Sequence, residues 1–211
     1  MSNTAQSAAS TRIASLLDAN SFVEIGGQIT ARSTDFNLSA KETPSDGVIT
    51  GYGVIDGNLV YVYSQDASVL NGTVGEMHAR KITALYDLAM KTGAPVIGLV
   101  DCAGMRLQEA TDALEAFGSI YLKQTLASGM IPQITAVFGT CGGGMAIIPA
   151  LTDFTFIEIP KRQNVRKQPE CTGWQLHRKM RYISCCIPER GTGTVDGTGS
   201  ERRNYLDRSV S

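Results

Sequence analysis

A glycine-rich loop between two apolar segments constrains the fold of this chain more than any other feature. The stretch 138–148 reads Phe-Gly-Thr-Cys-Gly-Gly-Gly-Met-Ala-Ile-Ile and continues the apolar run 134–138. We therefore expect a strand, a loop, and an apolar helix that ends near Pro149. Backbone N–H groups at such a helix start converge on one point, which suits a phosphate or an oxygen that becomes anionic during a reaction. Taken alone, the stretch is equally consistent with a turn that only allows close packing.

A second glycine turn in an equivalent position favours the ligand-binding interpretation. The turn 101–106, Asp-Cys-Ala-Gly-Met-Arg, follows the apolar run 95–100, which is typical of a buried parallel strand, and precedes a predicted helix over 109–127. Strand, turn and helix in that order, twice, indicate right-handed βαβ units in an α/β fold. Both turns then lie at the carboxyl ends of their strands, where ligands usually bind. Together they are able to present two N–H donors to one carbonyl oxygen.

The composition excludes several classes of protein. A chain of 211 residues with 43% hydrophobic content suits one domain, or one domain with a tail, and the net charge of −1 indicates neither nucleic-acid nor membrane binding. The polar start predicts no signal peptide, and we expect a cytoplasmic protein. Five cysteines without a CxxC pair predict no metal site and no disulfide framework. We interpret Cys102 and Cys141 as small buried filler rather than nucleophiles.

The remaining elements follow from periodicity and turn residues. Asp56-Gly57-Asn58 predicts a hairpin turn. His78, at the start of one predicted helix, is interpreted as a surface or interface residue rather than a catalytic base. The predicted elements are a helix over 11–19 capped by Ser10, a strand over 22–25, a polar loop over 32–45, strands over 47–55 and 59–63, and a helix over 76–91.

Residues 10–156 resemble the N-terminal half of the biotin-dependent acyl-CoA carboxyltransferases. This family includes the β chains of propionyl-CoA and acetyl-CoA carboxylases and related decarboxylase subunits. The resemblance does not depend on one glycine motif, because many separate segments match in order. The matching segments are 12–18, 21–24, 46–53, 64–66, 75–82, 101–109, 128–133 and 149–154.

The resemblance implies a crotonase-like fold, in which ββα units coil into a superhelix, and an acyl-CoA thioester as substrate. It implies that carboxybiotin on a separate carrier releases CO2, which the thioester enolate captures. It also implies several partners: biotin carrier and biotin carboxylase subunits, a C-terminal carboxyltransferase domain on another chain, and further copies of the same chain. The alternatives are a sodium-linked acyl-CoA decarboxylase subunit, and a non-catalytic truncated or frameshifted product.

The resemblance also assigns site residues. The family's Gly-Pro-Cys-Ala-Gly-Gly loop, whose adjacent glycines donate to the thioester oxygen, matches this chain with Gly143 and Gly144 as the catalytic pair and Gly142 in the alanine position. The family's Asp-Ser-Gly-Gly-Ala-Arg turn places Gly104, Met105 and Arg106 near the substrate. Met105 replaces a small residue and is expected to narrow the acyl pocket. Arg106 has two possible roles, to steady the turn or to contact a CoA phosphate.

The resemblance ends after about residue 156. We therefore divide the chain into an N-terminal crotonase-like domain over 1–156 and an atypical tail over 157–211, which leaves the fold incomplete. The tail from residue 160 holds 11 Lys and Arg but 5 Asp and Glu, so its formal charge is +6. Residues 161–188, written with permissible codons and translated one nucleotide later, give a Phe-Val-Asn-Ser-Pro-containing sequence typical of the family. We interpret the tail as largely out of frame and poorly ordered, which the coding nucleotides test directly.

Other classes fit less well. A basic, nucleic-acid-binding tail is one alternative for 160–211. A Rossmann dinucleotide site lacks its G-x-G-x-x-G motif with a following acidic residue. A serine hydrolase lacks the G-x-S-x-G elbow. We further expect the chain alone to be inactive, because the biotin site and much of the active-site wall belong to a second domain in the family.

Overall fold

The computed structural model describes residues 7–32 and 43–158, together with the backbone of 181–182. Most of the predicted loop over 32–45 and of the tail over 157–211 lies outside these residues. The helices are α1 (Ala8–Leu16), α2 (Glu76–Thr92), α3 (Ala110–Ala127) and α4 (Ile148–Leu151), with 3-10 turns η2 (Pro44–Gly47), η3 (Leu70–Gly72), η4 (Leu107–Glu109) and η5 (Gly143–Ile147). The strands are β1 (Val23–Ile25), β2 (Val48–Ile55), β3 (Asn58–Gln65), β4 (Val96–Cys102), β5 (Gln133–Cys141), β6 (Phe154–Ile157) and β7 (Arg181–Tyr182).

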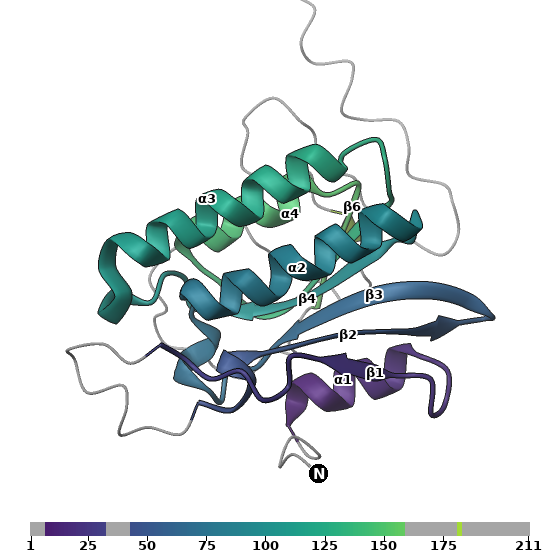
Figure 1. Ribbon diagram of the computed structural model, residues 1–211, viewed down its shortest axis with the longest axis horizontal. Coiled ribbons are helices and arrows are strands. Elements are labelled where there is room, and N and C mark those ends of the chain that lie inside the picture. The colour runs from purple at the N-terminus through teal and green to yellow at the C-terminus, as the bar shows by residue number, and fades with distance from the viewer. Residues whose placement is uncertain (1–6, 33–42, 159–180, 183–211) are drawn as a thin grey trace, which may run out of the picture.

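The described strands form one mixed sheet in chain order, β1 to β7. The pairs β1–β2, β2–β3 and β6–β7 are antiparallel, whereas β3, β4, β5 and β6 run parallel. Helices α2, α3 and α4 cover one face of the sheet and α1 lies on the other (Figure 1). This is the predicted α/β arrangement, in which crossover helices join adjacent parallel strands.

The hairpin prediction is confirmed. Asp56 and Gly57 join β2 to β3, and both have positive φ, +50° and +81°. Two successive left-handed residues form the turn whose twist matches the flanking strands, and Asp-Gly is a preferred pair for it. The two-residue connection fixes the register from Ile55 opposite Asn58 to Val48 opposite Gln65.

The first helix begins earlier than predicted. It spans Ala8–Leu16 instead of 11–19, and its N-cap is Ser7 rather than Ser10. The Ser7 hydroxyl accepts a hydrogen bond from the Ser10 N–H at 3.2 Å. Both serines are good caps, so local preference alone does not choose between them. Burial decides where the helix begins, because a helix that starts at Ala8 buries both Ala9 and Ile13 against the sheet.

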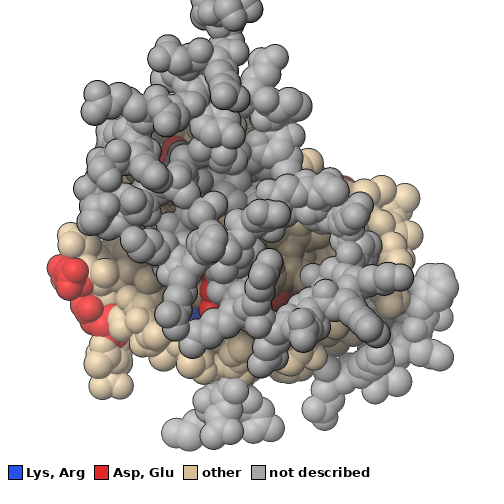
Figure 2. Space-filling view, turned by 180° about the vertical axis from the view of Figure 1, so that it is seen from behind, with Lys and Arg blue, Asp and Glu red and all other residues tan. Residues whose placement is uncertain are grey.

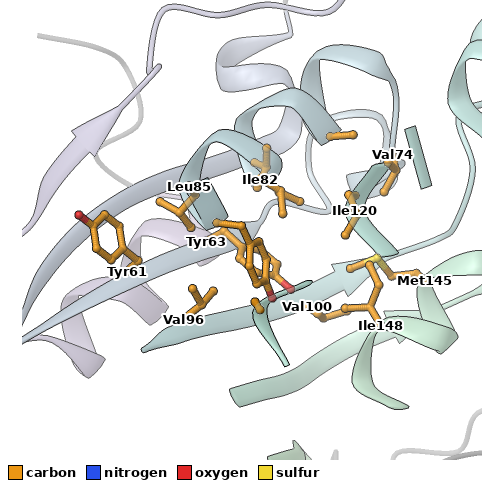
Figure 3. Packing of buried hydrophobic residues seen from close by; sticks show 14 of the residues in the cluster. Tyr61, Tyr63, Val74, Ile82, Leu85, Val96, Val100, Ile120, Met145 and Ile148 are labelled. Carbon is orange, nitrogen blue, oxygen red and sulfur yellow. The ribbon is translucent and has the colours of Figure 1, made fainter. Parts of the chain in front are cut away.

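Two apolar layers hold the sheet. The larger one packs β3, β4 and β5 against α2 and α3 and extends to the glycine loop through Met145 and Ile148 (Figure 3). The smaller one packs α1 against the opposite face, around Ile13, Val62 and Leu99. The glycine loop is therefore tied to the main core on one side, while the same strands contact α1 on the other.

The surface opposite the view of Figure 1 carries little positive charge among the atoms that can be seen. Asp and Glu side chains gather at one edge of this face, and most of the visible described surface is uncharged (Figure 2). The described helices include none that is long and apolar enough to cross a membrane.

Candidate functional site

The two glycine turns meet at the carboxyl ends of β4 and β5, as predicted. The strands pair in parallel, and Cys102 lies opposite Cys141. Beyond this pair the Gly142 N–H donates to the Cys102 carbonyl at 3.0 Å. Because one turn hydrogen-bonds to the other, their backbones form a single rigid edge rather than two independent loops.

Close contact between the turns requires glycine at two of the predicted positions. A Cβ at Gly142 would lie 2.6 Å from the Ala103 carbonyl oxygen, closer than carbon and oxygen approach. A Cβ at Gly104, which has a φ of +121°, would lie 3.2 Å from the Gly142 carbonyl oxygen. These glycines therefore act by letting one backbone rest on the other.

Gly143 and Gly144 open η5 rather than an α-helix, which corrects the expectation of a continuous apolar helix. The 3-10 turn ends where α4 begins, and α4 carries Pro149 in its first turn. Proline lacks an N–H and fixes φ, so an α-helix does not run unbroken from the glycines through residue 149. A four-residue helix and one 3-10 turn supply little macrodipole, so any anion binding here depends on individual N–H groups.

The first two N–H groups of η5 have no acceptor inside the turn. Gly143 has a φ of +56°, and a Cβ there would meet nothing within 4 Å. Met145 donates back to the Gly142 carbonyl at 3.1 Å, whereas the backbone bonds between described residues include none donated by Gly143 or Gly144. The left-handed glycine thus turns the chain at a point where two consecutive N–H groups have no backbone acceptor among the described residues. The space beside the Gly143 Cα is open, whereas Gly144 lies against two aromatic side chains of α3.

The sequence did not predict a role for Tyr121, which anchors the same loop. Its hydroxyl donates a short hydrogen bond to the Gly144 carbonyl. A Cβ at Gly144 would lie 2.8 Å from the Tyr121 Oη and 3.2 Å from the Phe117 ring. Both aromatic residues belong to α3 and reach the loop only through the tertiary fold. Periodicity identifies Phe117 as a core residue, but no local pattern marks the bond to Gly144.

Arg106 is a structural residue in this fold. Its side chain is fully buried, and Nη1 contacts Asp46 at 2.6 Å and Glu109 at 2.9 Å. Nη2 donates to the Thr73 carbonyl at 2.8 Å. Of the two roles that the sequence left open, the geometry supports the one that steadies the turn. A guanidinium without exposed surface does not reach a CoA phosphate, so we withdraw Arg106 as a substrate contact.

Met105 follows Gly104 in the same turn and is half-buried. It forms an isolated parallel bridge with Val74, and its side chain packs against the larger core layer. The Val74 N–H donates to the Gly104 carbonyl at 2.9 Å, and the Arg106 N–H donates to the Val74 carbonyl at 2.9 Å. The turn is therefore joined to the segment that leads into α2.

His78 is a core residue, so its placement at the surface is wrong. The ring has no exposed area, with Nδ1 2.9 Å from the Asp46 carbonyl and Nε2 3.1 Å from Gln65 Nε2. A carbonyl only accepts and an amide nitrogen only donates, so the neutral ring carries its proton on Nδ1. Burial, together with nearby Arg106 and Lys81, lowers the pKa of His78 to about 3. The ring is neutral at pH 7, and a role as catalytic base has no exposed atom to act through.

The cysteine interpretation is confirmed for Cys102. Its thiol is fully buried and lies 3.3 Å from the Gly104 N–H, and burial raises its pKa to about 11. A thiol protonated at neutral pH is a poor nucleophile. Cys141 is half-buried against the larger core layer. Within the described ranges, no group of three or more His, Cys, Asp or Glu is placed to hold a metal ion.

Solved structures identify the class of this fold and site. The chain matches the 12S core of transcarboxylase, crystallised as a hexamer with hydrolysed methylmalonyl-CoA bound, with a TM-score of 0.70 and 38% identity over 72% of this chain and 30% of that one. A malonate decarboxylase hetero-tetramer from Pseudomonas matches with a TM-score of 0.65 and 26% identity, over 74% of this chain and 60% of that one. The fold is that of the crotonase-like carboxyltransferases.

The sequence places the chain more narrowly. The carboxyl transferase domain model matches residues 3–165, and the chain belongs to that family. The methylmalonyl-CoA decarboxylase subunit alpha of Veillonella parvula is 51% identical over 146 residues, which are 69% of this chain and 29% of that protein. The biotin-dependent acetyl-/propionyl-coenzyme A carboxylase beta5 subunit of Mycobacterium tuberculosis is 48% identical over 146 residues, 69% and 27% of the two chains. The chain thus spans under a third of the length of these curated relatives.

Proposed function

We propose that this chain forms one half of a carboxyltransferase site, which binds an acyl-CoA and stabilises its thioester enolate. The backbone N–H groups of Gly143 and Gly144 donate to the thioester oxygen as it becomes anionic. Preorganised donors lower the barrier because they need no reorientation when the charge develops, and the loss of one such donor typically costs about 3–4 kcal/mol. Gly104 and Gly142 hold the opposing turn against this loop, and Met105 limits the acyl pocket.

One observation carries the proposal. Two glycine turns at adjacent strand ends hydrogen-bond to each other, and the consecutive N–H groups of Gly143 and Gly144 that follow have no backbone acceptor among the described residues. Open space lies beside Gly143. A phosphate-binding role fits less well, because η5 and α4 are too short to add the dipole of a long helix.

The named relatives support an acyl-CoA as the substrate class. One matching structure has hydrolysed methylmalonyl-CoA bound, and the matched curated proteins are named for methylmalonyl-CoA and for acetyl- and propionyl-CoA. The proposed carboxyl source is carboxybiotin on a separate carrier, consistent with the biotin-dependent name of one relative. We assign no described residue to biotin, and the proposed steps of this chain concern the thioester alone.

A decarboxylase subunit is the second candidate, favoured by the 51% identity to a methylmalonyl-CoA decarboxylase alpha subunit. Carboxylation and decarboxylation pass through the same thioester enolate, in opposite directions. The same two N–H donors therefore serve both reactions, and the partner subunits decide the direction. A third candidate is a non-catalytic chain without a working site.

Thioester binding tests the proposed site. We expect propionyl-CoA to bind the full chain more tightly than CoA does, as measured by isothermal titration calorimetry. Replacing Gly143 by alanine is expected to weaken propionyl-CoA binding at least about fivefold, roughly 1 kcal/mol. An alanine at a φ of +56° is strained, so the loop relaxes and turns its N–H groups away.

Gly93→Ala is the matched control for that experiment. Gly93 caps α2 with a φ of +70°, and a Cβ there also meets nothing within 4 Å, so the two variants carry the same kind of backbone strain. We expect Gly93→Ala to lose comparable stability and to keep its affinity for propionyl-CoA. Equal affinity of the wild-type chain for CoA and propionyl-CoA would show that the proposed oxyanion site does not exist and would favour the non-catalytic alternative.

Turnover is expected to require other chains. The 211 residues cover 29% of the Veillonella relative, so we expect this polypeptide not to carboxylate propionyl-CoA or acetyl-CoA. Free biotin, bicarbonate, ATP and a biotin carboxylase are supplied, so that carboxybiotin is formed in the assay. The assay follows incorporation of labelled bicarbonate into acid-stable product, with a complete propionyl-CoA carboxylase as positive control. Incorporation by the isolated chain would show that the proposed half-site is already a whole one.

A further inference from the structure

The carboxylate of Asp101 lies at an irregularity in the β4–β5 ladder, directly before the glycine loop. The ladder pairs Val100 with Val137 and then Cys102 with Cys141, so residues 138–140 of β5 lie opposite Asp101 alone. Surplus residues on one strand leave ladder N–H groups without a partner strand carbonyl. The Thr140 N–H instead faces Asp101 Oδ1 at 3.3 Å. The Asp101 side chain therefore supplies the acceptor that a strand carbonyl would otherwise provide, at the point where β5 leads into the glycine loop.

The chain makes room for this carboxylate. A Cβ at Gly139 would lie 2.1 Å from Asp101 Oδ1, which no side chain tolerates. Gly139 does not need to be glycine for its φ, because it is absent from the positive-φ glycines. Its small size is explained by contact with Asp101, a constraint separate from that on Gly143.

The second oxygen of Asp101 is held by a helix on the other face of the sheet. Arg12 of α1 places Nη2 2.8 Å from Asp101 Oδ2, with side chains only 18% and 14% exposed. Arg12 Nη1 donates to the Gln65 carbonyl at 3.3 Å, and the guanidinium lies 4.8 Å from the centre of the Phe138 ring. Three contacts in different directions fix the guanidinium, so it is a rigid partner for the carboxylate.

Gln65 at the end of β3 completes the support from the core side. The Asp101 N–H donates to Gln65 Oε1 at 3.2 Å, and Gln65 Nε2 faces Met145 Sδ at 3.7 Å and His78 Nε2 at 3.1 Å. The backbone and side chain of Asp101 are thus both held, and neither contact uses the glycine donors themselves.

We propose that Arg12 and Asp101 are positioning residues for the thioester site. The ion pair between them sets the direction in which β5 leaves the sheet, and so the aim of the Gly143 and Gly144 N–H groups a few residues later. Helix α1 thereby acts on the site from the opposite face of the sheet without touching substrate. The function of the pair rests on the proposed thioester site, whereas its effect on the loop does not.

A positioning role for the Arg12–Asp101 pair differs from a purely stabilising role in which measurement it affects. The Arg12 and Asp101 side chains keep some exposure, 18% and 14%, so water can solvate the group that remains when its partner is removed, and loss of Arg12 is expected to leave the chain folded. A small reorientation of preorganised donors nevertheless reduces their interaction with the substrate oxygen. The expected signature is a large effect on the loop and on thioester recognition, with a small effect on global unfolding.

Three variants test the pair: Arg12→Ala, Asp101→Asn and the double variant. Two readouts are measured on the full chain, the hydrogen-exchange protection of the Thr140 amide by NMR and the ratio of CoA to propionyl-CoA dissociation constants. We expect each single variant to lower both by at least about fivefold, and the double variant to match the singles, because both remove one interaction. Arg12→Lys is expected to restore part of each, since it keeps the charge.

Arg80→Ala is the matched control. Arg80 of α2 pairs with Glu76 at 2.7 Å but its side chain is 68% exposed, so Arg80→Ala is expected to change neither readout. Unchanged Thr140 protection in folded Arg12→Ala or Asp101→Asn overturns the proposal, as does an equal change in Arg80→Ala. If the wild-type chain does not distinguish propionyl-CoA from CoA, the proposed function fails, and Thr140 protection still decides whether the pair positions the loop. If Arg12→Ala does not fold, Asp101→Asn and Arg12→Lys carry the test.

Discussion

Replacing Arg106 by alanine is expected to lower the free energy of unfolding by about 3–5 kcal/mol, the usual cost of removing one partner from a buried ion pair. Arg106, Asp46 and Glu109 have side chains with no exposed area. Without the guanidinium, two carboxylates remain in the core, and neither is solvated. Burial already raises the pKa of Asp46, while Arg106 opposes that rise, so the loss of Arg106 leaves burial unopposed.

Urea denaturation at pH 7, followed by circular dichroism, measures this cost. The control is Arg80→Ala, which breaks an exposed pair and is expected to cost at most about 1 kcal/mol. A triple variant that joins Arg106→Met to Asp46→Asn and Glu109→Gln is expected to recover part of the loss, because it removes the unpaired charges. An Arg106→Ala chain as stable as Arg80→Ala would mean that the three side chains do not form the buried cluster.

Acidification is expected to destabilise the chain through His78. The pKa of His78 is about 3 in the folded chain, against about 6.5 for an unperturbed histidine. Below pH 6.5 the unfolded chain therefore binds a proton that the folded chain rejects. The free energy of unfolding falls by up to about 1.4 kcal/mol per pH unit from this group, until the pH approaches 3.

Burial is the main cause of the low pKa of His78, with the charge of Arg106 second, and the hydrogen-bond geometry of the ring points the same way. A protonated Nε2 becomes a donor that faces the donor Gln65 Nε2 at 3.1 Å. The amide cannot flip without cost, because Gln65 Oε1 accepts from the Asp101 N–H. Protonation of His78 therefore either leaves two donors facing each other in the core or breaks the hydrogen bond from the Asp101 N–H to Gln65.

Unfolding free energies measured from pH 7 to pH 5 in the wild-type chain and His78→Gln test this linkage. The variant keeps a polar side chain and lacks the titrating ring, so its pH dependence should be shallower by a large part of the predicted slope. Parallel curves for the two chains would show that His78 is protonated as easily in the folded state as in the unfolded one.

Local patterns predicted most of the framework. Apolar runs gave the parallel strands at 95–100 and 134–138, and Asp56-Gly57 gave the hairpin, because buried strands and tight turns depend on residues close in sequence. The predicted carboxyl ends of both strands, at 100 and 138, fall short, because β4 extends to Cys102 and β5 to Cys141. Glycines and cysteines near strand ends look like turn residues unless the neighbouring strand is known.

The errors arise where distant residues decide. His78 looked like a surface residue because its own helix is polar, yet Asp46 and Gln65, from two other elements, bury it and satisfy both ring nitrogens. Arg106 looked like a possible phosphate ligand because cationic side chains are rarely fully buried. Its acidic partners include Asp46, sixty positions away, which no local spacing reveals.

The sequence by itself determined the family, the crossover order of strands and helices, and the glycine loop, since these depend on short motifs and on periodicity. Only the tertiary structure decided that the loop opens a 3-10 turn, that Tyr121 and Asp101 hold it, and that α1 reaches it through Arg12. These contacts join residues 20 to 90 positions apart, and they form because packing on both faces of one sheet brings the ends of its strands to a common edge.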